Sequence, residues 1–433
     1  MDADEVRLPR GPTAGLEGRI PTPRRSPDAA PHVLHVAQPP DGGVPEYVAA
    51  VAIDQARRGW RVSVAAPPQG TVRRRLDGDR AEASLVPWSA GRGTRSLRRD
   101  VRSLAELVRV AQPDVVHLHS STAGLAGRLV VRGRIPTIFQ PHAWSWQAVP
   151  PVAAPVLRAG ERRALRWTSA LVCVGHDEAE TGRRAGLGHR LRVVRSGVDL
   201  ERYRPVGAAE RAATRAELGL PAAAPVVVCV GRCTRQKGQD VLVAAWPAVR
   251  AACPTAILVL VGDVQRGGVR IPSGTAGIRQ VGPVDDVRPW YAAADVVVVP
   301  SRWEGLALTV LEAMACGRPV VASDVDGIRE VLDDGLDEDA APPEAGALVP
   351  PADPPALADA VVARLRDDER RRREGEAARG RAERFDVAVT HEELAGLTAE
   401  VAGLLRTARS ASGTPAPTRG SAGTRRHRWG SSP

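Results

Sequence analysis

Aromatic residues are scarce in this sequence of 433 residues: nine Trp, three Tyr and two Phe make up only 3% of the chain. Hydrophobic residues nevertheless reach 43%, so Val, Leu and Ala must build the interior. Charged residues make up 25%, a proportion typical of globular proteins. A chain of this length is expected to form two domains, each long enough to bury a sizeable core.

The sequence also lacks long apolar stretches. No run approaches the ~20 apolar residues of a membrane span, and the acidic N-terminus does not resemble a secretory signal. The five cysteines are scattered, and no second pair joins Cys229 and Cys233 to complete a zinc site. We therefore expect a cytoplasmic protein with reduced thiols.

Acidic residues are absent after Glu400, and the whole chain carries a net charge of +10, supplied almost entirely by Arg. A basic balance is typical of proteins that bind nucleic acid, anionic lipid or phosphorylated ligands. Much of the excess lies in the end segments, and there is no basic platform rich in aromatics for stacking bases. We expect no nucleic-acid partner.

Residues 1–30 and 409–433 have no periodicity and are rich in Pro, Arg, Gly and Ser, so we predict that both tails are disordered. Between the tails, short apolar runs alternate with helical patterns, and the runs are continuous, as in parallel strands covered on both faces. This alternation of apolar runs and helical patterns is interrupted near 195–210 and then resumes. The predicted strands begin at the following residues: 32, 61, 114, 137, 170 and 191 before the break, and 225, 256, 278, 295, 319 and 347 after it.

These patterns predict an α/β protein of two Rossmann-like domains with parallel sheets, which face each other across a cleft. We place the first domain at 31–200, the second at 201–384, and a C-terminal helix that returns to the first domain at 385–408. Ligands of such sheets bind at the carboxyl ends of the strands, where helix N-termini collect.

Gly42 and Gly43 follow the first strand and precede a predicted helix. Two glycines allow the backbone to approach a phosphate closely, and the new helix offers free amides. A plain tight turn is the alternative. Neither G-x-G-x-x-G nor G-x-x-x-x-G-K-[ST] occurs in the chain, so a dinucleotide or P-loop site is unsupported.

Arg232 and Lys237 follow the strand at 225–231, and Gly238 begins a helix. Two cations at the mouth of a cleft suit a diphosphate. The alternative is a pair of solvated surface charges.

Glu304 and Glu312 lie in "PSRWEGLALTVLEAMACG", where we expect a helix to begin around Leu306. An unpaired buried carboxylate is costly, so Glu312, embedded among apolar residues, needs hydroxyl donors. A ribose diol fits Glu312 and the hydroxyls of a sugar fit Glu304. The alternative is a helix with an exposed acid.

Histidines follow two of the predicted strands. His142 comes after the strand at 137–140 and is expected to face the cleft, although a lone His is more often structural. We expect His117 and His119, which alternate along their strand, to face opposite ways. His119, Ser120 and Ser121 lie nearest the strand end and are candidates to contact an acceptor.

Several segments closely resemble the retaining glycosyltransferases of family 4, also called group 1. They are "GRCTRQKGQD", "VVVPSRWEGLALTVLEAMACGRPVVAS" with its two glutamates separated by seven residues, and "DVDGIREVL". "DGGVPEYV" and "VVRSGVDLERYRP" match the glycine loop and interdomain segment of the family, so the resemblance covers about 31–405. It implies the GT-B fold and transfer of a sugar from a nucleotide diphosphate with retention of the anomeric configuration.

The resemblance also implies roles for individual residues. Arg232 and Lys237 would neutralise the diphosphate leaving group, Glu304 and His142 would contact the donor sugar, and Glu312 would hold the ribose. These four residues would form the catalytic group: His142, Arg232, Lys237 and Glu304. The implied donor-binding set adds Glu312 and the backbone around the phosphates: Gly42, Gly43, Gly305, Leu306 and Ala307. No metal or other cofactor is implied.

Two positions depart from the family pattern. Ser196 stands where Asn is usual, and "DGIRE" replaces the commoner Gly-Gly-x-Pro-Glu. Both lie away from the expected phosphate chemistry.

The expected substrates are a UDP- or GDP-linked sugar and a glycan or polyprenyl-diphosphate-linked acceptor in cell-surface or exopolysaccharide synthesis. "HLHSSTAGLAGR" resembles members that extend such acceptors, and the basic stretch 91–104 suits anionic lipid at the inner face of a membrane. An Arg-rich surface without that role is the alternative for this stretch. The alternative for the whole chain is a non-catalytic protein that binds sugar nucleotides or serves as a scaffold on the same fold.

Overall fold

The computed structural model of the chain describes residues 30–403 apart from 81, 92–93, 266–267, 272–274 and 334–344. The tails that we predict to be disordered therefore lie, except for Ala30, outside the described residues.

The described residues of the N-terminal half form a seven-stranded sheet in the order β3-β2-β1-β4-β5-β6-β7, in which every pair of neighbours is parallel. β1 and β4 are buried along their whole length, which explains their continuous apolar sequences. The strands are β1 (His32–Val36), β2 (Arg61–Ala66), β3 (Ala83–Pro87), β4 (Val115–His119), β5 (Thr137–Gln140), β6 (Ala170–Cys173) and β7 (Leu191–Val193).

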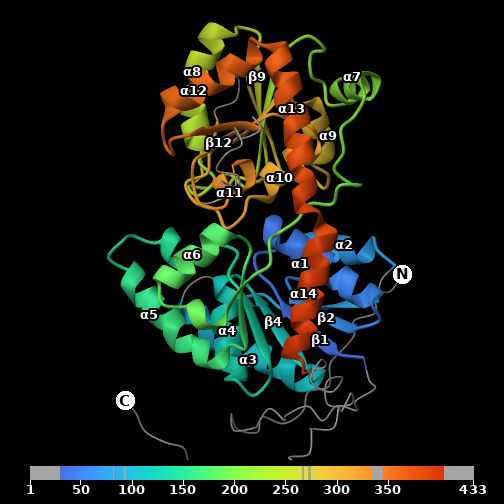
Figure 1. Ribbon diagram of the computed structural model, residues 1–433, viewed down its shortest axis with the longest axis vertical. Coiled ribbons are helices and arrows are strands. Elements are labelled where there is room, and N and C mark those ends of the chain that lie inside the picture. Colours follow the sequence, from blue (N-terminus) through green and yellow to red (C-terminus); the bar gives the residue numbers. More distant parts are fainter. Residues whose placement is uncertain are drawn as a thin grey trace, which may run out of the picture.

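Helices cover both faces of this sheet in the lower half of Figure 1. Val, Leu, Ala and Ile make up most of the two core clusters between the helices and the sheet, as the scarcity of aromatics requires. The helices are α1 (Gly43–Arg57), α2 (Thr71–Asp77), α3 (Thr94–Ala111), α4 (Ser120–Val131), α5 (Ala154–Ala164) and α6 (His176–Arg184), with 3-10 turns η1 (Ser145–Ala148), η2 (Leu165–Trp167) and η3 (Gly188–Arg190).

The described residues of the C-terminal half form a second parallel sheet of six strands in the order β10-β9-β8-β11-β12-β13. The strands are β8 (Val226–Val230), β9 (Ile257–Val261), β10 (Ile278–Val281), β11 (Val296–Val299), β12 (Val320–Ser323) and β13 (Gly346–Val349). The helices around it are α7 (Ala208–Glu217), α8 (Gln239–Ala252), α9 (Arg288–Ala293), α10 (Leu308–Ala315), α11 (Arg329–Leu332), α12 (Pro354–Leu365) and α13 (Asp368–Ala382).

The chain ends by crossing back to the first sheet. After α13 and the turn η4 (Glu383–Phe385), α14 (Val387–Val401) runs down the lower domain in Figure 1. Leu394 and Leu397 of α14 lie in the core cluster formed by α1, β2 and β5. Glu392 forms an ion pair with Arg58 at the end of α1, at 2.7 Å. α14 is therefore part of the N-terminal unit.

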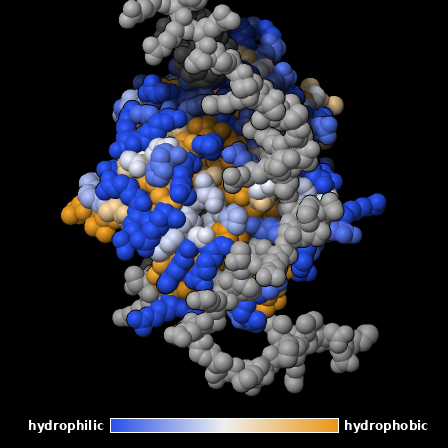
Figure 2. Space-filling view, turned by 60° about the horizontal axis from the view of Figure 1, so that its bottom comes forward, coloured by the Kyte–Doolittle hydropathy of each residue, from blue (hydrophilic) through white to orange (hydrophobic). Residues whose placement is uncertain are grey.

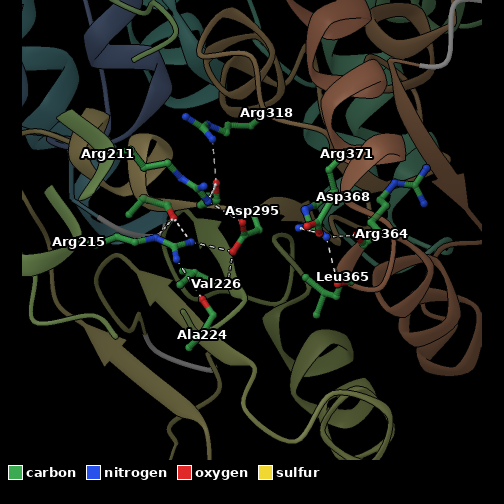
Figure 3. Close-up of polar contacts among 12 residues, drawn as sticks. Arg211, Arg215, Ala224, Val226, Asp295, Arg318, Arg364, Leu365, Asp368 and Arg371 are labelled. Atoms are coloured by element: carbon green, nitrogen blue, oxygen red, sulfur yellow. Dashed lines mark hydrogen bonds and ion pairs between the residues drawn. The ribbon is translucent and has the colours of Figure 1, made fainter. Parts of the chain in front are cut away.

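An arginine network fastens α7, the first helix after the interdomain segment, to the second sheet (Figure 3). Arg211 and Arg215 of α7 donate to Asp295 at 2.5 and 2.7 Å, and the same carboxylate accepts from the backbone N–H of Val226 at 2.7 Å. Burial acts to raise the pKa of Asp295, but the two arginines and this hydrogen bond keep it below its usual value. Since Asp295 precedes β11, the network sets where that strand begins.

The predicted fold class is confirmed: two Rossmann-like parallel sheets build the molecule, and each predicted strand is present. Neither β3 nor α2 was predicted from the sequence. β3 is an edge strand whose residues are exposed or half-buried, so it lacks the apolar run that marks the others. α10 begins at Leu308, two residues later than expected.

None of the helices in the described part of the chain has the length and apolar character needed to cross a membrane. Hydrophilic side chains dominate the face in Figure 2, with separate hydrophobic patches between them.

Candidate functional site

The loops after β8 and β11 bring together two of the predicted site residues, Lys237 and Glu304. The Lys237 Nζ lies 2.5 Å from Glu304 Oε1, and the Ser301 hydroxyl donates to the same oxygen at 2.6 Å. Glu304 is only 6% exposed, so these two partners must compensate its carboxylate for the hydration that it loses on burial. The ion pair lies at the carboxyl edge of the second sheet, where ligands of this fold class bind.

Glu312 lies on α10, half-buried, and accepts a hydrogen bond from the Tyr291 hydroxyl of α9 at 2.8 Å. The Tyr203 side chain is a further hydrogen-bond partner. Burial raises the pKa of Glu312 to about 7, although both tyrosines act against the rise. Sequence reasoning expected hydroxyl partners for this acid and did not identify the two tyrosines that the fold supplies.

A pocket of about 270 Å³ lies beside Glu312 and between the two halves of the chain. Glu46 and Tyr47 of α1 line it on the N-terminal side, and Leu308 and Glu312 of α10 line it on the other. Glu312 therefore reaches a space that a ligand can enter.

The glycine loop of the N-terminal domain faces the cations of the other domain. A Cβ atom at Gly42 would lie 3.3 Å from Arg232 Nε, and Gly42 has a φ of 111°, which side chains rarely tolerate. Gly43, the first residue of α1, faces Leu308 in the same way, at 3.4 Å. The predicted phosphate loop and the predicted arginine thus lie side by side.

His142 follows β5 and meets the segment before α10. Its backbone carbonyl lies so close to Gly305 that a Cβ atom there would be 2.7 Å away. His142 has a left-handed φ of 57°, and burial of its ring lowers its pKa to about 3. Leu306 and Ala307, which complete this segment, are buried. Residues from both domains therefore converge where the donor sugar is expected.

Behind His142 the carboxyl ends of β1 and β4 carry three fully buried histidines, His35, His117 and His119. Our expectation that His117 and His119 face opposite ways is wrong. Their rings stack at 4.0 Å between centroids, because residues two apart in a strand share a face. His119 Nδ1 lies 3.1 Å from His142 Nε2 and His119 Nε2 lies 3.0 Å from His35 Nδ1.

Sequence reasoning missed His35 altogether. β1 and β4 are neighbours, and the register places His35 opposite His117. The available signal was the presence of histidines near the ends of two predicted strands. In the described part of the chain, His35, His117 and His119 are also the residues that could hold a metal ion, with ligand atoms within 4.8 Å of one another.

The two predicted acceptor serines begin α4. Ser120 has a left-handed φ of 73°, and its buried hydroxyl has no hydrogen-bond partner among the described residues. Ser121 is half-buried. They follow His119 directly, so an acceptor role for them remains a prediction from that position.

Sequence reasoning also missed a contact that joins the domains through the segment in which "DGIRE" departs from the family pattern. Glu330 of α11 accepts from the backbone N–H groups of His176 and Asp177, at 2.6 and 3.2 Å, in the first turn of α6. The Asp177 carboxylate in turn accepts from the Gly327 N–H at 3.1 Å. An acid at a helix N-terminus is favourable, so this segment holds the domains together on one side of the cleft.

Comparison with known protein families finds two matches. Residues 41–202 match "Glycosyltransferase Family 4" and residues 224–367 match "Glycosyl transferases group 1". The chain is 36% identical to a D-inositol 3-phosphate glycosyltransferase of Xylanimonas cellulosilytica over 298 residues, which cover 63% of this chain and 68% of that protein. A protein of the same name from Nocardia farcinica is 31% identical over 412 residues, or 84% and 86% of the two chains.

The fold is similar to that of Anabaena Alr3699/HepE, solved in complex with UDP-glucose. The TM-score is 0.70 at 20% identity, and the match covers 86% of this chain and 100% of that chain. With the family matches, the two facing sheets and the paired strand-end loops, this places the chain in glycosyltransferase family 4 (group 1): it is a glycosyltransferase with the GT-B fold.

Proposed function

We propose that this enzyme transfers a sugar from a UDP- or GDP-linked donor, with retention of the anomeric configuration, to a glycan or polyprenyl-diphosphate-linked acceptor of cell-surface or exopolysaccharide synthesis. The observation that carries the proposal is the convergence of Lys237, Glu304 and Arg232 with the glycine loop at Gly42. The complex of the Anabaena relative with UDP-glucose supports a nucleotide sugar as the donor.

In this proposal Lys237 and Arg232 bind the diphosphate. Negative charge grows on the diphosphate as the bond to the sugar breaks, and cations placed there beforehand stabilise that charge more than they stabilise the bound donor. The ion pair with Glu304 holds the Lys237 side chain in place, so little reorganisation is needed. These two cations supply the charge that a metal ion would otherwise provide, and we propose that the reaction needs no cofactor.

Glu304 and His142 would position the sugar, and Glu312 would accept hydrogen bonds from the ribose. Tyr291 already shows that the Glu312 carboxylate accepts from a hydroxyl, and the neighbouring pocket gives a ribose access to it. Holding the donor at several points fixes its reacting carbon relative to the acceptor.

The acceptor would enter from the N-terminal domain, near Ser120 and Ser121 at the start of α4. Arg98, Arg99 and Arg102 are exposed on α3, and we propose that they contact anionic lipid at the inner face of the cytoplasmic membrane. The curated relatives favour a second candidate, a small polyol phosphate, because their names specify D-inositol 3-phosphate.

The test begins with thermal unfolding in the presence of UDP, GDP, ADP and their sugars. One nucleotide series should raise the melting temperature of the wild type by a few kelvin, and Glu312→Ala should abolish the rise. Glu376→Ala is the matched control, because Glu376 is an exposed acid on α13 away from the site. A wild type that responds to no nucleotide would contradict the proposal.

The nucleotide sugar identified in this way is then incubated with a polyprenyl-diphosphate-linked glycan and, separately, with an inositol phosphate. Transfer to the first supports the proposed acceptor, and transfer to the second supports the alternative. Binding of a donor without hydrolysis or transfer would favour the non-catalytic interpretation.

A further inference from the structure

Hydrogen bonds link three imidazoles and one amide in a continuous row that ends at His142. Gln55 Oε1 of α1 accepts a hydrogen bond from His35 Nε2, 2.8 Å away. His35 Nδ1 lies 3.0 Å from His119 Nε2, and His119 Nδ1 lies 3.1 Å from His142 Nε2. We call Gln55, His35, His119 and His142 the imidazole row. Gln55, His35 and His119 are at most 1% exposed, so water does not compete for the two bonds among them.

The imidazoles of this row are neutral at physiological pH. Burial lowers the pKa of His35 to about 4 and that of His142 to about 3, and it places the pKa of His119 well below the usual value. A neutral imidazole carries one N–H and one lone pair, and the hydrogen bond made by one nitrogen decides the role of the other. Three imidazoles therefore supply one donor for each of the three bonds.

The Gln55 amide sets the direction of the row. With its oxygen toward His35, His35 Nε2–H donates to Gln55, which leaves His35 Nδ1 to accept from His119 Nε2–H. His119 Nδ1 must then accept from His142 Nε2–H. The opposite orientation of the amide would reverse all three bonds.

We infer that Gln55, acting through His35 and His119, is a positioning residue that holds His142 in the Nε2–H tautomer. His142 Nδ1 then carries a lone pair and is the ring nitrogen left for a ligand. It therefore accepts a hydrogen bond from a hydroxyl group of the bound substrate. That last step rests on the proposed function, in which the hydroxyl belongs to the donor sugar. The tautomer itself does not depend on any activity.

His117 supplies a control within the same cluster. Its ring stacks on that of His119, yet neither nitrogen has a hydrogen-bond partner of good geometry among the residues that the structure describes, although the Gln140 amide is close enough to influence its pKa. It lies beside the row without belonging to it. A variant at His117 removes a ring that packs on His119 but removes no hydrogen bond of the row.

A metal ion is the competing explanation of the cluster. An ion held by His35, His117 and His119 would take the lone pairs of His35 Nδ1 and His119 Nε2 and so remove the hydrogen bond between them. The groups that influence the pKa of His117 and His119 are imidazoles and one amide, with no carboxylate among them. Three imidazoles can hold zinc without a carboxylate, but the 3.0 Å contact between His35 Nδ1 and His119 Nε2 is that of a hydrogen bond, which favours the row.

The tautomers can be read from long-range ¹H–¹⁵N spectra of full-length protein labelled with ¹⁵N-histidine, which contains nine histidines. A His142→Gln spectrum assigns His142. The expected wild-type result is the Nε2–H tautomer at His142, replaced by a mixture of tautomers in Gln55→Met and retained in His117→Leu. If Gln55→Met does not fold, His35→Leu breaks the row one position closer to His142.

Either an Nδ1–H tautomer at His142 in the wild type or an unchanged spectrum in the variant that breaks the row would overturn the inference. So would one equivalent of zinc, copper, nickel or iron in the purified wild type that is lost in His117→Leu.

Kinetics provide a second measurement once a donor is known. Gln55→Met should lower kcat about fivefold, as expected for one disordered hydrogen bond, and leave the KM for the nucleotide sugar within about twofold. His117→Leu should keep the wild-type kcat. An equal loss in both variants would point to packing and overturn the positioning role. An absence of transfer by the wild type, together with the predicted tautomers, would reject the proposed function alone.

Discussion

The two sides of the cleft use different chemistry. On the C-terminal side, a charged pair, Lys237 and Glu304, lies in loops after β8 and β11. On the N-terminal side, the corresponding strand ends carry His35, His117 and His119, all neutral and fully buried. One fold thus places a fixed ion pair on one side of the cleft and buried neutral imidazoles on the other.

The same difference predicts how the two sides respond to mutation. Removing one partner of a buried ion pair leaves an uncompensated charge, which costs about 3–5 kcal/mol. Removing one bond from a neutral network costs about 1 kcal/mol, and removing a buried polar group that has no partner can even stabilise the protein. Mutations on the charged side should therefore have the larger effects.

The largest effect is expected for Lys237→Met. It removes a cation from the proposed diphosphate site and should lower kcat about 10²–10³-fold, as loss of one group that stabilises transition-state charge does. It also leaves Glu304 without its ion-pair partner, so the free energy of unfolding should fall as well. Steady-state kinetics and denaturant unfolding measure the two losses separately.

The double variant Lys237→Met/Glu304→Gln separates charge chemistry from stability. It should recover most of the unfolding free energy and none of the activity. Arg302→Ala is the control, because Arg302 pairs with Asp240 on the surface beside the same loops and should change stability by less than about 1 kcal/mol. Recovery of activity in the double variant would show that Lys237 acts only by neutralising Glu304.

Lys237 is also the single lysine of the sequence. An amine-directed reagent therefore modifies, apart from the α-amino group, only this residue, and a bound nucleotide sugar should protect it.

An intermediate effect of opposite sign is expected for His117→Leu on the neutral side. Burial holds the pKa of His117 well below 6.5, so the folded protein resists a proton that the unfolded chain accepts. The stability associated with neutral His117 is present above pH 6.5 and is lost as the pH falls toward the lower folded pKa. Relative to wild type, His117→Leu should therefore gain more stability at pH 5 than at pH 7.5.

Denaturant unfolding at the two pH values measures this gain, with His189→Leu as the control, since His189 lies on the turn η3 away from the cluster. A variant that is destabilised equally at both pH values would show that the unpartnered imidazole contributes packing and no electrostatic cost.

The sequence was most informative where chemistry and chain position coincide. Continuous apolar runs predicted both sheets, and the two glutamates separated by seven residues marked the loop and helix that carry Glu304 and Glu312. β3 was not predicted because an exposed edge strand needs no apolar run. His35 was not identified because its role depends on the register of β1 with β4. The sequence of a single strand does not reveal which strand lies beside it.

The prediction for His117 and His119 failed for a different reason. The period of a strand places residues two apart on the same face, and this period was available from the sequence alone. The partners of Glu312 and the contact of Glu330 with α6, in contrast, join segments far apart in the chain. Their positions required the folded molecule.

The smallest effect that we expect is on the charged side: donor binding should depend on pH through Glu312. Burial raises the pKa of this carboxyl to about 7, so it loses its proton between pH 6 and 8. In the proposed role of Glu312, its ionised form accepts ribose hydroxyls better than the protonated form, so the Kd of the nucleotide sugar should fall by up to about tenfold as the pH rises across this range. Calorimetric titration measures it, and a nucleotide sugar is preferred to a free nucleotide because its diphosphate does not titrate there.

Two variants test the origin of this pH dependence. Glu312→Gln should bind the donor more weakly and with the same affinity at each pH. Glu46→Gln should shift the midpoint to lower pH, because the negative charge of Glu46 contributes to the raised pKa of Glu312. The tenfold change would have to come from another group if it survived in Glu312→Gln. His35 and His142 on the opposite side are neutral throughout this range, so neither contributes to this pH dependence.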